Sequence, residues 1–355
     1  MPDTPHSISS SPAHDDSRLE ELRRWLAGQQ ATGGTIVPAA ADASFRRYFR
    51  LHPENGTTRI VMDAPPDKEN LEAWLRVSGL LAGVGVHVPK IERADPARGF
   101  VVMEDLGDDS YARVHDRRDP LWERCIADAL DTLVLMQHGI PPGRLPVYDE
   151  TRLRSEMDLF PVWLLGRHLG LDAGRGRDLL APLAERLVAE ALKTPYRFTH
   201  RDYHSRNLLA GPPPLPGVID FQDAVWGPVT YDLVSLLKDC YIDWPRTEQK
   251  RWLVRYLDAS PTDVRRALDP ETLLFRFDLM GVQRHLKAAG IFARLFWRDG
   301  KAAYLESIPR TLDYIVQAAS EWPLLTPFAG FLRENVLPHL DEARRRAHGE
   351  AACTP

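Results

Sequence analysis

The sequence predicts an α+β protein with two lobes, a small β-rich lobe followed by a larger lobe that is mainly α-helical. The chain has 355 residues, which is more than a single hydrophobic core usually holds. Short β-prone runs gather before residue 107, whereas apolar residues recur with helical spacing after it. Residues 104–108 interrupt both patterns with acidic side chains and a glycine, and we interpret them as a hinge.

The first lobe is expected at 17–107 and contains a small antiparallel sheet with one helix. A short amphipathic helix at 17–27 precedes the sheet. Strands are predicted at 33–37, 46–51, 59–62, 90–93 and 100–103, and the helix of the lobe at 67–82. Residues 1–16 have no apolar core, so we expect a mobile tail there and neither a signal peptide nor a membrane anchor.

The second lobe is expected at 109–355 and is mainly helical with a small β insert. Helices are predicted at 120–137, 149–169, 178–192, 230–241, 247–257, 271–296, 301–319 and 328–347. In the insert, 197–199, 208–209 and 218–219 are predicted to be short strands, with a turn at 211–214. We expect these strands to form one small hairpin sheet.

Composition excludes several classes of protein. The net charge of -5 gives no reason to expect a nucleic-acid surface, which needs clustered Lys and Arg. The cysteines Cys125, Cys240 and Cys353 form no Cys-x-x-Cys pair, so neither a disulfide framework nor a zinc site is indicated. We therefore expect a cytoplasmic monomer that acts on small molecules and binds no membrane.

The most informative motif is the segment 200–207, followed by Asp220 in the segment 218–223. Asp202 is a carboxylate that can accept a proton from an attacking hydroxyl, and Asn207 and Asp220 supply two oxygen ligands for Mg²⁺. The expected hairpin would bring all three to one end of its sheet. Taken singly, each could be an ordinary loop residue that caps a turn, but their order and spacing favour a phosphoryl-transfer site.

The order of these elements resembles the kinase-like fold, in its aminoglycoside phosphotransferase and choline kinase branch. Protein kinases follow the corresponding Asp-Phe with Gly, whereas Asp220-Phe221 continues here as Gln222. Within this branch, the chain is most similar to the bacterial anomeric sugar kinases of cell-wall recycling. The segments that carry this similarity are 44–50, 61–66, 200–209, 218–225 and 290–295.

The resemblance implies that ATP and Mg²⁺ are used to phosphorylate the anomeric hydroxyl of N-acetylmuramate or N-acetylglucosamine. Asp202 would orient and deprotonate that hydroxyl. His200 is expected to bond the backbone near the metal site, and His204 either contacts the sugar or packs. Asp232 either caps the helix that follows it or also braces the catalytic loop.

The nucleotide site departs from the wider family pattern. Protein kinases end the third strand in an apolar pair and a phosphate-binding lysine, but the chain has Asp63 there. Arg46 and Arg47 are candidate substitutes, since guanidinium groups match phosphate oxygens, or they are ordinary edge-strand residues. The resemblance implies that the backbone of the hinge, at Glu104 and Leu106, contacts adenine.

The acceptor site is expected to include Gln222 and Asp223 as well as the long helix after residue 271. Arg284 and Lys287 are three residues apart on that helix and share one face. A cationic face would favour the lactyl carboxylate of N-acetylmuramate and would repel an aminoglycoside. The alternative is a solvated basic side of the helix.

Two rival functions remain open at this point. The first is a kinase of another small alcohol, such as an aminoglycoside, choline or homoserine. The second is a catalytically silent kinase-like module, which the absent lysine favours and the intact Asp202, Asn207 and Asp220 oppose.

Overall fold

The computed structural model describes residues 17–28, 34–41 and 45–343. The expected tail at 1–16, Cys353 and the end of the last predicted helix lie outside the described residues. Contacts divide the chain into two compact units, 1–72 with 89–105 and 73–88 with 106–355. The boundary between Asp105 and Leu106 falls inside the segment that we interpreted as a hinge.

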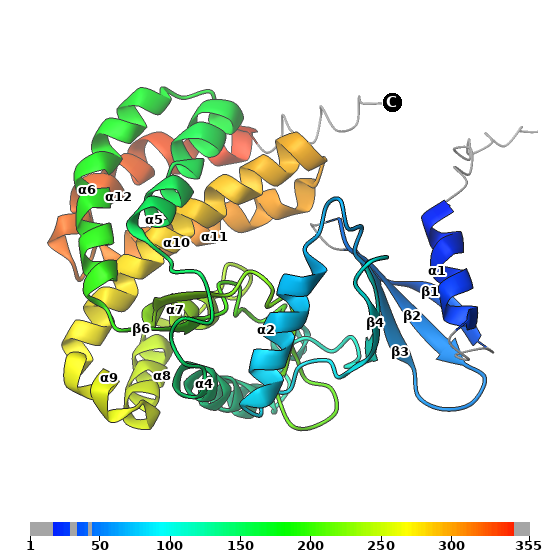
Figure 1. The fold of residues 1–355 in the computed structure, drawn as a ribbon. Helices are drawn as coiled ribbons and strands as arrows, with labels where there is room; N and C mark the ends of the chain where they lie inside the picture. Colours follow the sequence, from blue (N-terminus) through cyan, green and yellow to red (C-terminus); the bar gives the residue numbers. More distant parts are fainter. Residues whose placement is uncertain (1–16, 29–33, 42–44, 344–355) are drawn as a thin grey trace, which may run out of the picture. The chain divides into compact units, whose positions relative to one another are not determined.

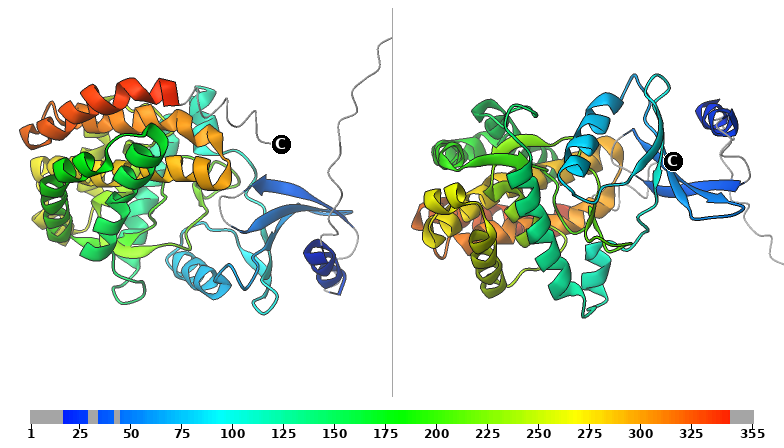
Figure 2. Two further views of the ribbon diagram at one scale, coloured as in Figure 1. Left: turned by 90° about the horizontal axis from the view of Figure 1, so that it is seen from above. Right: turned by 60° about the horizontal axis from the view of Figure 1, so that its bottom comes forward.

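The first unit is built on a five-stranded antiparallel sheet with the strand order β1-β2-β3-β5-β4 (Figure 1). The strands are β1 (Gly34–Ala41), β2 (Arg47–Pro53), β3 (Arg59–Asp63), β4 (Ile91–Asp95) and β5 (Phe100–Glu104). Helix α1 (Ser17–Gly28) covers one face of this sheet, where Leu22 and Leu26 pack against Phe49, Val61 and Phe100 (Figure 2). Because side chains alternate along a strand, Arg47 lies on the same face as Phe49.

Helix α2 (Leu71–Gly83) follows the third strand, as the sequence predicts. Most of it groups with the second unit, although the sequence analysis assigned it to the first lobe. The ring of Trp74 lies 5.2 Å from the ring of Phe221, centroid to centroid, and Val84 packs against Gly139. The apolar face of α2 is therefore buried against the helical unit.

The second unit is mainly helical, and its long central helix is α10 (Pro270–Asp299), which is buried over most of its length. The other helices are α3 (Tyr111–Asp116), α4 (Trp122–Gly139), α5 (Glu150–Met157), the π-helix η1 (Phe160–Leu169), α6 (Ala173–Lys193), α7 (Thr230–Leu237), α8 (Arg246–Ala259), α9 (Thr262–Ala267), the 3₁₀ turn η2 (Ala302–Ser307), α11 (Ile308–Ala318), the 3₁₀ turn η3 (Pro323–Leu325), α12 (Thr326–Phe331) and the π-helix η4 (Leu332–Val336). Helices α6, α7, α11 and η1 pack against α10 (Figure 1).

The predicted helices differ from the observed ones mainly where the chain changes helix type. The single helix expected at 149–169 is an α-helix followed by the wider π-helix η1. Near this point a Cβ on Gly290 would lie 2.4 Å from the carbonyl carbon of Leu159, so only glycine lets the two backbones approach so closely. The short helices α3 and α9 were not predicted, because six residues are too few to show a helical period.

The prediction of one hairpin sheet at 197–219 is wrong. Strand β6 (Tyr196–Thr199) pairs with β9 (Val225–Pro228), whereas β7 (Leu208–Leu209) pairs with β8 (Gly217–Val218). Strand pairing is decided by contacts between segments far apart in the chain, and β9, the partner of β6, was not predicted to be a strand. The described helices include none that is long and apolar enough to cross a lipid bilayer.

Candidate active site

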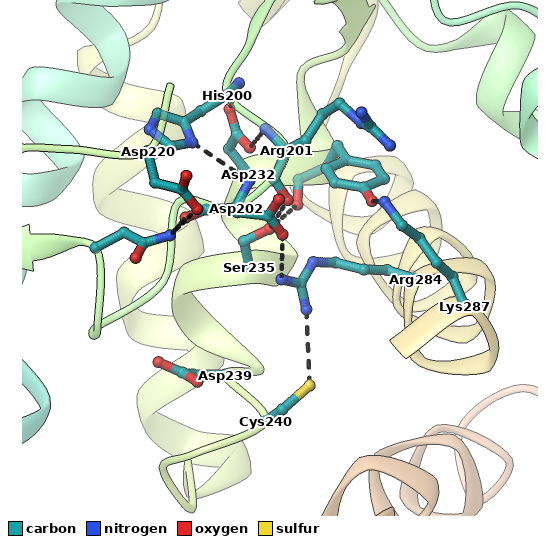
Figure 3. A network of polar contacts seen from close by, with 12 residues as sticks. His200, Arg201, Asp202, Asp220, Asp232, Ser235, Asp239, Cys240, Arg284 and Lys287 are labelled. Carbon is teal, nitrogen blue, oxygen red and sulfur yellow. Dashed lines mark hydrogen bonds and ion pairs between the residues drawn. The ribbon is translucent and has the colours of Figure 1, made fainter. Parts of the chain in front are cut away.

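Asp202 and Asp220 lie near each other in the second unit, where the loop after β6 meets the segment after β8 (Figure 3), and the side chain of Asn207 contacts both residues. The amide Nδ2 of Asn207 donates to the backbone carbonyl of Asp202 at 3.0 Å and lies 3.3 Å from Oδ2 of Asp220. This amide therefore ties the two acidic residues together. The backbone N–H of Ile219 also donates to the carbonyl of Asn207, so the two segments are joined by backbone as well as side-chain hydrogen bonds.

His200 is buried and connects the same two segments. Its Nε2 lies 3.1 Å from the carbonyl of Ile219, and its Nδ1 accepts the backbone N–H of Asp202 at 3.3 Å. Burial lowers the pKa of His200 to about 4, so the ring is neutral at neutral pH. A neutral imidazole has one donor and one acceptor, and both are used here.

Two backbone positions in the site lie in the left-handed region. Arg201 has a φ of 80° and Asp220 a φ of 63°. Each costs on the order of 1 kcal/mol for a residue with a side chain and persists only where neighbouring contacts hold it. Arg201 is held by Glu156, whose Oε1 lies 2.5 Å from its guanidinium. Arg201 directly precedes the proposed base Asp202, and Asp220 is itself a proposed metal ligand.

Two buried aspartates accept backbone N–H groups of the loop 200–207. Asp232, in the first turn of α7, accepts the backbone N–H groups of His200 and Arg201, and it makes no N-cap contact. Asp239, just beyond α7, accepts the N–H of Ser205 at 2.9 Å. Burial raises the pKa of Asp232 to about 7, although the two N–H donors favour the carboxylate. Bracing, and not N-capping, is thus what the structure shows for Asp232.

Cationic side chains surround the carboxylate of Asp202, which is partly buried. Lys287 donates to the hydroxyl of Tyr231 at 3.0 Å and pairs with Glu156 at 3.3 Å. Arg284 lies 3.8 Å from Oδ1 of Asp202. Burial raises the pKa of Asp202, but the charges of Lys287, His204, Arg284 and Arg201 outweigh it and lower the pKa to about 2. Asp202 is therefore ionised and is suited to orienting a hydroxyl.

Arg284 and Lys287 do not form a solvated basic side of helix α10, which was the alternative interpretation of the sequence. Both are buried. Arg284 points toward Asp202 (Figure 3), and the amine of Lys287 points toward the hydroxyl of Tyr231. His204 packs edge-on against Tyr241, with 5.3 Å between ring centroids, and its Nδ1 is buried without a partner among the described residues. Burial lowers the pKa of His204.

The remaining acceptor-site candidates lie directly after Asp220. The amide of Gln222 donates to Oδ1 of Asp220 at 2.8 Å, so it orients that carboxylate. Asp223 is exposed, and its backbone carbonyl lies 3.5 Å from the guanidinium of Arg201.

The structure does not bring the candidate phosphate-binding residues Arg46 and Arg47 together. Arg47 lies on the face that α1 covers and binds Oδ2 of Asp63 at 2.6 Å, while Arg18 of α1 binds Oδ1 at 2.8 Å. Arg46 is buried, 3.8 Å from Glu69. The strand end that carries a lysine in protein kinases is thus a buried carboxylate between two guanidinium groups.

The two hinge candidates fall in different units. Glu104 pairs with Lys90 through the backbone, and its side chain accepts the N–H of the same residue. Leu106 packs in the second unit, where a Cβ on Gly211 would lie 2.0 Å from the carbonyl oxygen of Leu106. Glycine at 211 therefore permits this close backbone approach.

The sequence analysis missed Glu156 and Asp239. Glu156 lies inside a predicted helix, and nothing in its local pattern shows that it pairs with residues 45 and 131 positions away. Asp239 follows Asp232 by seven residues, a spacing that places two residues of a helix on the same side. That spacing was the available signal.

A carboxylate that can receive a proton, beside an amide and a second carboxylate, defines a phosphotransferase of the kinase-like class. The model of the phosphotransferase enzyme family matches residues 35–270. The chain belongs to this family, and the resemblance found in the sequence is confirmed.

Two relatives match over nearly their whole length. The N-acetylmuramate/N-acetylglucosamine kinase of Pseudomonas aeruginosa is 42% identical over 334 residues, which cover 90% of this chain and 97% of the relative. The protein of the same name in Pseudomonas putida is 40% identical, with 91% and 98% covered.

Solved structures of low sequence identity share the fold. The choline kinase LicA from Streptococcus pneumoniae has a TM-score of 0.62 at 12% identity and covers 86% of this chain and 100% of its own. The ADP-bound aminoglycoside phosphotransferase APH(2'')-Ib has a TM-score of 0.54 at 14% identity, with 86% and 99% covered. These likenesses confirm the predicted α+β kinase-like fold.

Proposed function

We propose that the protein transfers the γ-phosphoryl group of ATP to the anomeric hydroxyl of N-acetylmuramate, N-acetylglucosamine or both. The observation that carries this proposal is the convergence of Asp202, Asn207 and Asp220 in a chain that is 42% identical to a kinase named for these two sugars. The use of these sugars would place the enzyme in the recycling of cell-wall material in the cytoplasm, where it would act as a monomer.

Asp202 accepts a hydrogen bond from the anomeric hydroxyl and takes its proton as the phosphoryl group is transferred. Because such transfer is largely metaphosphate-like, alignment of the hydroxyl matters more than the strength of the base. The low pKa of Asp202, about 2, fits this role. Glu156 pairs with both Arg201 and Lys287, and these ion pairs fix the two cationic side chains near the Asp202 carboxylate.

Asn207 and Asp220 offer the oxygen donors that Mg²⁺ prefers. No cluster of three His, Cys, Asp or Glu side chains that would hold a metal occurs in the described part of the chain, which suits a cation that keeps several waters and phosphate oxygens as ligands. Bound there, Mg²⁺ would neutralise charge on the nucleotide phosphates.

Nucleotide binding is proposed for the backbone at Glu104 and Leu106. Arg47 is engaged with Asp63 on the face that α1 covers, so only Arg46 of the two arginines stays a candidate phosphate contact. His204, Gln222, Asp223, Arg284 and Lys287 are proposed to border the sugar. All five belong to the same unit as Asp202.

The proposal is tested by incubating the protein with ATP, Mg²⁺ and a panel of acceptors: N-acetylmuramate, N-acetylglucosamine, choline, homoserine and an aminoglycoside. Phosphorus NMR of the product, with and without proton decoupling, identifies the oxygen that was phosphorylated. We expect a sugar 1-phosphate, whose signal is coupled to the single anomeric proton.

The matched control is Asp202→Asn, which keeps the shape of the side chain. We expect turnover to fall by about 10³-fold or more with nearly unchanged ATP binding, since the variant cannot accept the proton. Transfer to choline or the aminoglycoside in preference to the sugars would refute the proposed substrate. Asp202→Asn turnover within a few-fold of wild type would refute the proposed base.

A further inference from the structure

Arg284 is a buried cation without an oxygen acceptor. Its side chain is only 6% exposed. Nη1 lies 3.7 Å from Sγ of Cys240, a weak acceptor, and Nη2 lies 3.8 Å from Asp202, beyond hydrogen-bond distance. Nε is buried with no partner among the described residues. A guanidinium carries five N–H donors, and in this site none of them bonds to an oxygen of the described chain.

Three other buried or half-buried cations of the same unit bond oxygen acceptors. Lys238 donates to Asp278 at 2.6 Å, and Arg246 binds Asp278 and Glu321, each at 2.8 Å. Lys287 binds Tyr231 and Glu156. A buried charge without hydrogen bonds lowers the stability of a protein, so its presence points to a ligand that completes it.

The position of Arg284 indicates which part of the ligand it meets. The guanidinium lies beside the Oδ1 atom of Asp202, the atom that we propose to bind the attacking hydroxyl. A ligand group that contacts both this oxygen and Arg284 therefore lies at the reacting centre. The lactyl group of N-acetylmuramate is attached two ring carbons away from the anomeric carbon, whereas the phosphoryl group is bonded to the anomeric oxygen itself during transfer.

We propose that Arg284 donates hydrogen bonds to an oxygen of the phosphoryl group while it is transferred. In this step the sugar O1–phosphorus bond forms and the bond between phosphorus and the β–γ bridging oxygen breaks. The electron pair of the broken bond leaves on ADP, and the hydroxyl proton passes to Asp202. Arg284 offsets the negative charge on the phosphoryl oxygens, as an arginine supplied in cis does in some nucleotide hydrolases. The inference deepens the proposed function and rests on it.

The experiment compares Arg284→Met with Arg246→Met, since both replace a guanidinium of the same unit by an apolar chain. For Arg284→Met we expect kcat to fall by about 10³-fold equally with N-acetylmuramate and N-acetylglucosamine, and the KM values to stay within a few-fold. We expect its Tm to be unchanged or higher, because an unsatisfied buried charge has been removed. For Arg246→Met we expect a clearly lower Tm and kcat within a few-fold of wild type, because Asp278 and Glu321 lose their partner.

A second measurement uses ADP, Mg²⁺ and aluminium fluoride, which together mimic the transferring phosphoryl group. In wild type, aluminium fluoride should increase the affinity for ADP. Arg284→Met should lose most of this increase in affinity but should bind ADP alone as wild type does. A higher KM for N-acetylmuramate only would show carboxylate recognition and overturn the inference. A large loss of Tm with a small loss of kcat would show a structural role and overturn it too. If wild type phosphorylates no sugar, the proposed function fails instead.

Discussion

Asp232 and Asp239 hold the two ends of one catalytic loop. Asp232 accepts the backbone N–H of His200 at 2.6 Å and of Arg201 at 3.0 Å (Figure 3). Asp239 accepts the N–H of Ser205 at 2.9 Å. The loop residues between these anchors include Asp202. A buried carboxylate that accepts backbone N–H groups fixes the chain more firmly than a neutral acceptor does. Asp232 in α7 and Asp239 just beyond it thereby position the proposed base, Asp202.

The first prediction concerns these anchors. Asp232→Asn leaves one of the two N–H groups with only a neutral amide oxygen as acceptor and places an amide donor opposite the other, so the free energy of unfolding should fall by about 1–3 kcal/mol. We also expect kcat to fall by at least about 10-fold, since the loop is less well positioned. Urea unfolding and steady-state kinetics measure the two effects.

The matched control for the loop anchors is Asp243→Asn, which makes the same chemical change at an exposed position of the same region. It should leave the stability and kcat nearly unchanged. If Asp232→Asn behaves like this control, the carboxylate of Asp232 does not hold the loop.

The second prediction concerns pH. Burial lowers the pKa of His200 to about 4, whereas an imidazole in the unfolded chain has a pKa near 6.5. The stability that a neutral His200 contributes is therefore complete above about pH 6.5. It is lost as the pH falls toward 4, because only the unfolded chain binds the proton, with a total effect of at most about 3 kcal/mol.

His200→Gln should remove this part of the pH dependence. Its amide can donate to the carbonyl of Ile219 and accept the N–H of Asp202, but it does not titrate. Free energies of unfolding at several pH values from 7 to 4 should therefore decline less steeply in the variant. Parallel curves for the two proteins would show that His200 does not stay neutral in the folded state.

The third prediction concerns the metal. Asn207→Ala and Asp220→Asn each remove or weaken an oxygen ligand, so the Mg²⁺ concentration that gives half-maximal activity should rise on the order of 100-fold. Calorimetric titration of ADP with and without Mg²⁺ gives an independent measurement. Addition of EDTA should abolish turnover in wild type. An unchanged Mg²⁺ requirement in Asn207→Ala would mean that Asn207 only bonds the loop backbone.

Much of the fold follows from local patterns. The five strands of the first unit and the long helix α10 carry strong periods in the chain, and the structure places them close to the predicted positions. Strand pairing in the small β insert was predicted wrongly, because the partner of β6 is β9, a segment farther along the chain that was not predicted to be a strand.

The candidate site was likewise only partly predictable from local patterns. Asp202, Asn207 and Asp220 are close in sequence, and their spacing alone indicated phosphoryl-transfer chemistry. Arg47 and Asp63 are adjacent across β2 and β3, so the pairing of strands, and not the local pattern, decides that this arginine meets a carboxylate.

By itself the sequence determined the order of the two lobes, the chemical types in the catalytic loop and the family to which the chain belongs. Those features are set by neighbouring residues and by regular spacing. Only the tertiary structure decided that Glu156 supports Arg201 and Lys287, and that Arg284 is buried beside Asp202 with no hydrogen bond to an oxygen of the described residues. Burial and ion pairing join residues that are far apart in the chain, and their energies depend on what surrounds each group after folding.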